Sequence, residues 1–305
     1  MKSEVFFTKR IVIVLGALLC CALWGSATPF IKIGYELILP HKDVSSTILF
    51  AGVRFLIAGI LTVVIYSIAR GKMLLPKKQN LSKIANVGLF QTVIQYLFFY
   101  IGLANTTGVK GTIASGSNAF FSLIIASVIF KQEKLSLKKL AACIVGFAGV
   151  VLINLNGLDF NMNFLGDGFV IFSSMAYGVS SALMKKYTKY EDPVIISGYQ
   201  FAMGGLFMTV TGLLLGGHIS ISTGAAAGVM VYLSLLSAIA YAVWGLLLKY
   251  NPVSKITVFT FMIPVFGSSL SMILLGEAGT VPIVNLVLTL LLISSGILLL
   301  NYKKE

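Results

Sequence analysis

The sequence predicts an all-α integral membrane protein with ten transmembrane helices, arranged as two inverted five-helix repeats with both termini in the cytoplasm. Three observations support this prediction: the composition is apolar, ten apolar runs are long enough to span a bilayer, and the chain contains an internal repeat. Of the 305 residues, 57% are hydrophobic and 11% are charged, whereas a soluble domain carries roughly 25% charged residues. The chain is therefore expected to lie in a lipid bilayer.

Five apolar runs in the first half predict spans. A bilayer core about 30 Å thick needs roughly 20 apolar residues per helix, and the runs of that length are bounded by charge, Gly, Pro or Asn. The first run is longer than the apolar core of a secretory signal, and further spans follow it, which favours a retained helix. The expected spans are 11–31, 47–69, 84–103, 110–130 and 140–156, bounded in that order by Arg10, Arg70, Lys83, Lys131 and Lys139.

The second half contains five further runs of the same kind. The connections between them are short and leave no room for a soluble domain. The expected spans are 166–185, 194–216, 225–248, 256–275 and 281–301, bounded in that order by Lys185, Pro193, Lys249, Lys255 and Lys303.

The basic residues predict the orientation of these spans. Almost all of the 23 Lys and Arg residues lie at the termini or in the loops that follow the even-numbered spans, and this bias places that side in the cytoplasm. The formal charge of +13 is therefore explained by topology, and nucleic acid is not an expected partner. The four exceptions are Lys32, Lys42, Arg54 and Lys110.

An internal repeat divides the chain into two homologous halves, 1–155 and 160–305. The stretch WGSATPFIK in the first span is matched by YGVSSALMK in the sixth. Because each half has an odd number of spans, the second half enters the membrane from the opposite side, which is typical of alternating-access transporters. The matched pairs are Trp24 with Tyr177, Lys32 with Lys185, Arg54 with Gln200 and Glu133 with Glu277, at offsets of 153, 153, 146 and 144 residues.

These motifs resemble the EamA branch of the drug/metabolite transporter superfamily. The resemblance rests on WGSATPFIK, on Gly276-Glu277 after the span that contains Pro264, on Glu133 in the first half, and on the two five-helix halves. It covers essentially the whole chain and implies export or uptake of amino acids, nucleotide-like metabolites, vitamins or drugs. One departure is Phe120, which stands where a proline opposite Pro264 is expected, so the two halves need not bend alike.

Uncharged polar and aromatic residues are the candidates for a substrate passage. Polar side chains recur on one face of the spans that the repeat makes equivalent, and amides at mid-span need partners or water. Aromatic rings would offer a stacking surface. The alternative is that small residues only let helices approach and that rings only pack. The candidates are Trp24, Gln95, Tyr96, Tyr100, Ser115, Asn118, Tyr177, Gln200, Tyr241 and Trp244.

Charged residues and prolines suggest further roles. Arg54 lies about 10 Å inside its span, where it would either attract a substrate carboxylate or phosphate or bind a carbonyl or headgroup. Pro29 and Pro264 are expected to bend their helices. Glu133 and Glu277 precede the fifth and tenth spans, where a carboxylate would cap amide donors at the helix start. No acidic residue falls at mid-membrane, which favours facilitated diffusion over a carboxylate proton relay.

The expected function is a secondary transporter of small organic metabolites, amino acids or similar compounds, acting as an exporter or facilitator in a bacterial cytoplasmic membrane. A lipid or lipid-linked carrier flippase is the alternative. An intramembrane enzyme is less favoured, because no HExxH, GxSxG or Walker A motif occurs. No cofactor or metal is expected, since Cys20, Cys21 and Cys143 all lie in apolar runs. The expected partners are the substrate and the bilayer, with the chain as a monomer or homodimer.

Overall fold

The computed structural model describes residues 2–41, 43–106, 108–155, 161–274 and 283–301, and the secondary structure of these ranges is helical throughout. The first half begins with a short helix, α1. Its third and fourth predicted spans each form one long helical rod that includes a π-helical stretch, η2 in the third rod (residues 81–104) and η3 in the fourth (residues 108–129). Its elements are α1 (Lys2–Thr8), α2 (Arg10–Ile38), α3 (Val44–Arg70), η1 (Lys78–Asn80), α4 (Leu81–Gly88), η2 (Leu89–Ile94), α5 (Gln95–Ala104), α6 (Gly108–Gly116), α7 (Asn118–Ile124), η3 (Ile125–Ile129) and α8 (Leu137–Ile153).

The second half has the same helical character. The ninth predicted span of the chain, which lies in this half, is built from a short α-helix, a 3₁₀ turn and a second α-helix. The elements of this half are η5 (Phe164–Gly168), α9 (Phe169–Tyr187), α10 (Pro193–Leu214), α11 (Gly224–Tyr250), α12 (Val253–Thr257), η6 (Val258–Phe261), α13 (Met262–Leu274) and α14 (Ile283–Asn301).

Local sequence explains where several helices start and stop. Asp43 caps α3 by accepting a hydrogen bond from Ser46 N, and Gly71 ends that helix in the left-handed conformation, at φ 65°. Asp192 caps α10 directly before Pro193, which suits the first helical turn. The first predicted span was placed seven residues too short, because α2 continues past Lys32 to Ile38.

Eight helical segments in the described ranges are long and apolar enough to cross a membrane. Large apolar side chains stay exposed on them, such as Ile68 at 76% and Leu214 at 83%, which suits a surface facing acyl chains. The other two predicted spans contain α8, with only 17 residues, and α9, which carries several serines and two lysines. The eight segments are 10–38, 44–70, 78–104, 110–129, 193–214, 224–250, 253–270 and 284–301.

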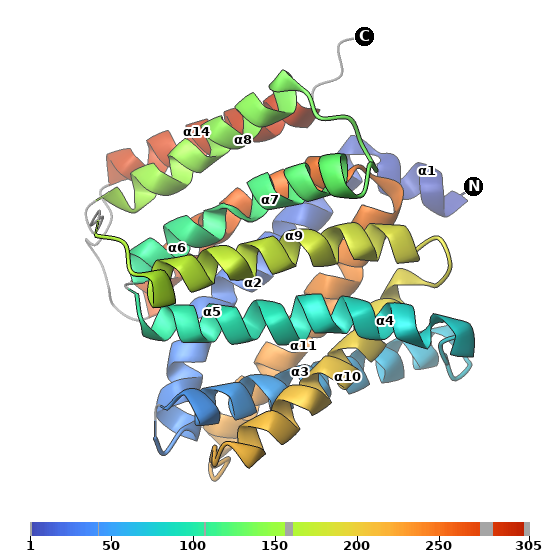
Figure 1. Cartoon of the computed structure of the whole chain (residues 1–305), viewed down its shortest axis with the longest axis vertical. Coiled ribbons are helices and arrows are strands. Elements are labelled where there is room, and N and C mark those ends of the chain that lie inside the picture. Colours follow the sequence, from blue (N-terminus) through green and yellow to red (C-terminus); the bar gives the residue numbers. More distant parts are fainter. Residues whose placement is uncertain (1, 42, 107, 156–160, 275–282, 302–305) are drawn as a thin grey trace.

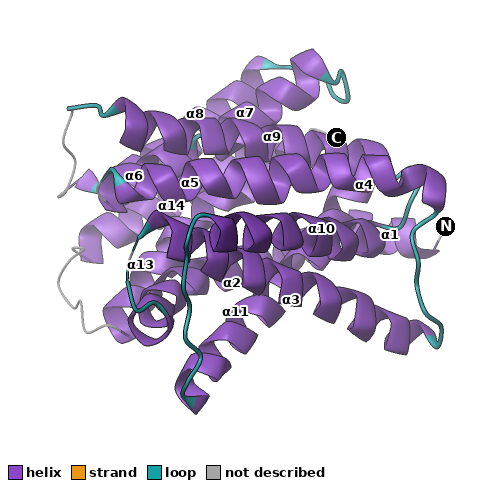
Figure 2. Cartoon of the chain, turned by 60° about the horizontal axis from the view of Figure 1, so that its bottom comes forward, coloured by secondary structure: helices purple, strands orange, loops and turns teal. Residues whose placement is uncertain are grey.

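The two halves interlock along the whole bundle. Figure 1 shows α8 beside α14 at one end, and α3 packed with α10 at the other. Between these pairs, α9 and the helices α4 and α5 lie in front of α2 and α11. Figure 2 shows the same bundle from another side, with short loops joining the helices. Both end pairs join helices that the predicted repeat makes equivalent.

Glycines allow the closest of these contacts, between α3 and α10. A Cβ on Gly59 would lie 2.4 Å from Ala202 N, and one on Gly205 would lie 2.3 Å from Leu56 N. Small residues let helix backbones approach in this way inside membranes. The α3–α10 pair therefore forms a tight backbone contact between the halves.

Candidate functional site

Aromatic residues from both halves meet in the interior of the bundle. The Trp24 ring lies 5.0 Å from Tyr241 and 4.9 Å from Trp244, edge to face in both cases. The hydroxyls of Tyr96 and Tyr241 share a hydrogen bond of 2.9 Å. We call the following set the central aromatic cluster: Trp24 on α2, Phe55 on α3, Tyr96 and Tyr100 on α5, Phe201 on α10, and Tyr241 and Trp244 on α11.

Several polar atoms in this region are buried without a hydrogen-bond partner among the described residues. They include Nε1 of Trp24, Nε1 of Trp244, the Tyr100 hydroxyl and Oε1 of Gln95, which precedes Tyr96 on α5. Buried indole N–H and amide groups normally find a partner. Trp24 and Tyr96 also keep some accessible surface although they pack against interior residues. The cluster therefore offers both flat apolar surfaces and spare hydrogen-bonding groups.

Arg54 lies beside the cluster. Its side chain is 3% exposed, and its guanidinium carbon lies 5.0 Å from the centre of the Phe55 ring. Nε donates to Leu233 O at 3.3 Å, and one terminal nitrogen donates to Ser237 Oγ at 3.0 Å. One of the two roles predicted for Arg54 was to bind a carbonyl, and Leu233 O is such a partner. These bonds join α3 to α11.

Gln200 and Tyr177 occupy other parts of the core. Gln200 is fully buried, and its Oε1 accepts a 2.6 Å hydrogen bond from Thr92 Oγ1, which links α10 to η2. Tyr177, on α9, is 4% exposed and lies close to Tyr241. Gln200 therefore has a packing role between helices, while Tyr177 borders the central aromatic cluster.

Ser115 and Asn118 lie on the fourth rod. The Ser115 hydroxyl donates to Gly111 O within its own helix, at 2.8 Å. Asn118 is half-buried and is the first residue of α7. The helix α7 packs against α9, and its apolar residues belong to the same core as Trp244. A role for either residue in a substrate passage stays a prediction.

The two prolines occupy different settings. α2 runs as one helix through Pro29. Pro264 lies near the start of α13, directly after the 3₁₀ turn η6. A 3₁₀ stretch inside a long helical rod is a frequent hinge. The point where the ninth predicted span switches from 3₁₀-helix to α-helix therefore lies next to Pro264.

Glu133 caps a helix, but not the helix that the sequence suggested. Its Oε1 accepts from Ser254 N at 2.9 Å, and its Oε2 accepts from Ser254 Oγ at 2.5 Å and from Lys139 Nζ at 2.6 Å. These bonds hold the start of α12, in the other half, whereas α8 is capped by Ser136. The predicted capping partner was wrong because sequence order does not give spatial neighbours. Glu277 lies outside the described residues.

Sequence reasoning missed several features of this region. Tyr35 belongs to the same apolar cluster, but it falls beyond the predicted end of the first span. The π-helix η2 directly precedes Gln95 and Tyr96, and such bulges are frequent at functional sites. No residue pattern in the sequence signals a π-helix.

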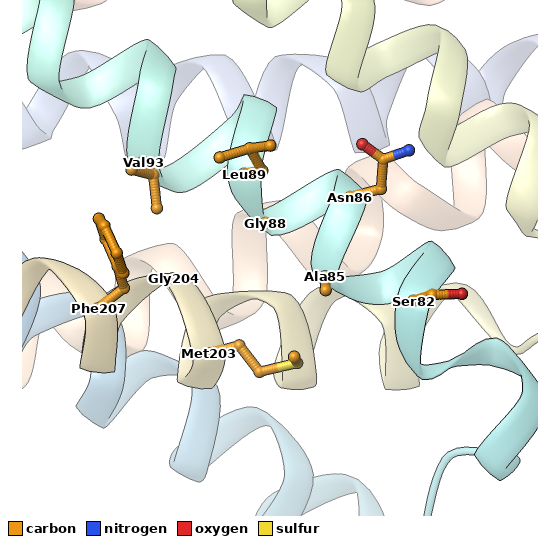
Figure 3. A pocket seen from close by; sticks show the side chains of 9 residues that line it. All are labelled: Ser82, Ala85, Asn86, Gly88, Leu89, Val93, Met203, Gly204 and Phe207. Atoms are coloured by element: carbon orange, nitrogen blue, oxygen red, sulfur yellow. The ribbon is translucent and has the colours of Figure 1, made fainter.

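A lateral groove opens between α4–η2 and α10, with a volume of about 470 Å³. Figure 3 shows Leu89, Val93, Met203 and Phe207 along it, with Ser82 at one end. Met203 and Phe207 are exposed at 39% and 55%. The groove is therefore an apolar surface on the outside of the bundle, between the two halves. Its lining residues are Ser82, Ala85, Asn86, Gly88, Leu89, Val93, Met203, Gly204 and Phe207.

No described group of three or more His, Cys, Asp or Glu residues is placed to hold a metal ion. The three cysteines are buried free thiols. Cys20 donates to Ala240 O at 3.3 Å and Cys21 donates to Phe259 O at 3.1 Å. They take part in helix packing.

Comparison with known proteins places these observations in a family. The model of the EamA-like transporter family matches residues 11–155 and again 164–302. An uncharacterized transporter of Archaeoglobus fulgidus is 26% identical, with 84% of this chain and 86% of the relative covered. The uncharacterized transporter YvbV of Bacillus subtilis is 26% identical, with 93% and 89% covered. A WAT1-related chloroplastic protein of Arabidopsis thaliana is 22% identical, with 83% and 61% covered.

A crystal structure of another protein has the same fold. It superposes with a TM-score of 0.78 at 17% identity and covers 96% of this chain and 97% of its own. At this identity the likeness concerns the fold alone.

Proposed function

The chain belongs to the EamA-like transporter family of the drug/metabolite transporter superfamily, and on that premise we propose that it is a secondary carrier of small organic solutes, amino acids or similar metabolites. The observation that carries the proposal is the central aromatic cluster. It joins Trp24, Phe55, Tyr96 and Tyr100 of the first family match to Phe201, Tyr241 and Trp244 of the second. A site shared by two related halves is where an alternating-access carrier binds its solute.

The proposed mechanism is rocking of two inverted repeats, residues 1–155 and 160–305, with ten spans and cytoplasmic termini. The double family match supports this division, and so does the pairing of equivalent helices, α3 with α10 and α8 with α14. In this arrangement α8 and α9 complete the ten spans. Labelling of introduced cysteines in intact cells tests the topology: Lys72→Cys should be protected, and a cysteine at His218 should react with an impermeant maleimide.

The central aromatic cluster contains no carboxylate, which favours facilitated movement, with export as the proposed direction and the bacterial cytoplasmic membrane as the location. Asp167 is buried and accepts hydrogen bonds from Thr106 Oγ1, just after the end of α5, and from Asn163 N, just before the start of η5. It therefore lies away from the central aromatic cluster. Without a mid-membrane carboxylate, a proton gradient has no obvious group through which to act.

The lateral groove bears on the flippase alternative. A lipid headgroup crossing the membrane needs polar partners along its path, because unpaired polar groups are costly in hydrocarbon. Along the groove the side-chain polar atoms come from Ser82 and Asn86, and both lie toward one end (Figure 3). The groove suits an acyl chain more than a headgroup path, which favours a soluble substrate.

Uptake into proteoliposomes tests the proposal. A panel of labelled amino acids, nucleosides and organic acids would be measured with and without an imposed pH gradient. We expect saturable flux of at least one solute, indifferent to the gradient. Gln95→Ala and Asn118→Ala test the passage assignment, and unchanged flux in both would refute it. Absence of flux for every solute would reject the proposed function.

A further inference from the structure

Arg54 places a positive charge in the interior of the bundle that no described carboxylate neutralises. The side chain is 3% exposed, and no carboxylate of the described residues forms an ion pair with it. A guanidinium has five N–H donors, and the bonds to Leu233 O and Ser237 Oγ engage two of them. A buried charge is costly unless it is paired. The group that this position lacks is an anion.

The surroundings of Arg54 suit an anion attached to a flat body. The guanidinium lies near enough to the hydroxyls of Tyr35, Tyr96, Tyr100 and Tyr241 to act on them electrostatically. Phenol hydroxyls donate hydrogen bonds to carboxylate and phosphate oxygens as well. Tyr96 and Trp24, which both contact Tyr241, keep some accessible surface.

We propose that Arg54 binds the anionic group of the transported solute, and that the substrate class is an organic anion, a carboxylate or a phosphate ester, with an aromatic or other flat apolar body. The body would stack on Trp24 and the tyrosines of the central aromatic cluster, and the unpartnered Nε1 of Trp24 would serve a polar substituent. This inference rests on the proposed transport function and adds the chemistry of the substrate.

The chain carries its own reporter for this site. It contains two tryptophans, Trp24 and Trp244, and their rings lie 4.9 Å apart in the central aromatic cluster. A ligand that stacks there would change intrinsic tryptophan fluorescence directly. The experiment is a fluorescence titration of the full chain in lipid nanodiscs with phenylacetate, phenyl phosphate and the neutral isostere phenylacetamide.

We expect saturable fluorescence changes with the anions and binding of phenylacetamide about 10- to 100-fold weaker, since a hydrogen bond to a charged group contributes that much. Whichever of phenylacetate and phenyl phosphate binds more tightly identifies the preferred anion. Arg54→Gln should weaken binding of the anions by a similar factor and leave binding of phenylacetamide unchanged. Arg54→Lys, which keeps the charge without the planar fork, should restore part of the anion binding.

Matched variants separate binding from structure. Arg70→Gln removes an arginine from the exposed end of the same helix, where it contacts Tyr66, and should bind all probes like the wild type. Ser237→Ala removes a protein partner of Arg54 but keeps the charge, and should preserve the preference for anions. If Arg54→Gln does not fold, the comparison of acid and amide in the wild type still decides the question.

Equal binding of acid and amide to the wild type would overturn the inference, as would a parallel loss of both in Arg54→Gln. Flux of only neutral or cationic solutes in proteoliposomes, with no anion binding, would also overturn it while leaving the transport function intact. Absence of flux for every solute would instead reject the transport function.

Discussion

The phenol oxygens of Tyr96 and Tyr241 lie 2.9 Å apart and join α5 of the first half to α11 of the second. Tyr241 is 4% exposed, so its hydroxyl has little access to water. This bond couples the two halves at the central aromatic cluster, where the proposed carrier would hold its solute.

Removing both of these hydroxyls should cost less than the sum of the costs of removing each alone. Tyr96→Phe leaves the Tyr241 hydroxyl buried and unpaired, which we expect to destabilise the fold by about 1 to 3 kcal/mol. In the double variant with Tyr241→Phe no group is left unpaired, so its loss should be smaller than the sum of the single losses. Thermal unfolding in detergent measures all three. Additive losses would mean that the bond does not couple the halves.

Gly205 should not tolerate a side chain. A Cβ there would lie 2.3 Å from Leu56 N and 2.8 Å from Leu56 Cα, and these backbone atoms cannot move aside cheaply. We expect Gly205→Ala to lower stability by about 1 to 3 kcal/mol through overpacking of α3 against α10. The matched control is Gly228→Ala on α11, where a Cβ meets no atom within 4 Å. If both variants unfold at the same temperature, the close contact of α3 and α10 is wrong.

Glu133 should stabilise the contact between the two halves that it bridges. Its side chain is 6% exposed, and its carboxylate accepts hydrogen bonds from Ser254 and Lys139. Glu133→Gln keeps the shape but loses the charge that Lys139 requires, so we expect a loss of about 1 to 3 kcal/mol. Ser136→Ala serves as control, because it removes the cap of α8 alone. A cysteine cross-link between positions 133 and 254 would restore the contact. A stable Glu133→Gln variant would remove Glu133 from the link.

Asp43 should make α3 sensitive to acid. Its pKa lies at about 2, below the ordinary 3.8, because the Ser45 hydroxyl and Ser46 N donate to its carboxylate. A lowered pKa in the folded state means that this stabilisation is complete above about pH 4 and is lost as the pH falls through 2. Asp43→Asn still caps the helix but does not titrate. Melting temperatures would be measured for both proteins from pH 5 to pH 2. The wild type should lose more stability toward pH 2 than Asp43→Asn does.

Several candidate residues from the sequence meet in the fold, but their partners could not be predicted. Composition and apolar runs indicated a membrane protein, and the fold brings the aromatic candidates Trp24, Tyr96, Tyr100, Tyr241 and Trp244 together or close. Their role in a substrate passage stays a prediction. Periodicity shows which face of a helix a residue occupies, but the helix that packs against that face depends on the whole bundle. Gln200 therefore turned out to bond Thr92.

The misplaced features have the same physical origin. The cap formed by Glu133 lies 121 residues away in sequence, on Ser254. α2 continues past Lys32 to Ile38 because lysine is a good helix former and does not end a helix. Tyr35, which lies on that extra length, was for this reason not among the expected site residues.

Counterflow in proteoliposomes tests the central claim most directly, because only a carrier that binds its solute alternately from each side exchanges labelled for unlabelled solute. Vesicles loaded with a solute that the wild type transports would be diluted into the same solute carrying a trace of label. We expect a transient accumulation of label above its equilibrium level, lost in Tyr241→Ala although that variant is inserted and folded. Label that rises to equilibrium without an overshoot, or an unchanged overshoot in Tyr241→Ala, would contradict a carrier site at the central aromatic cluster.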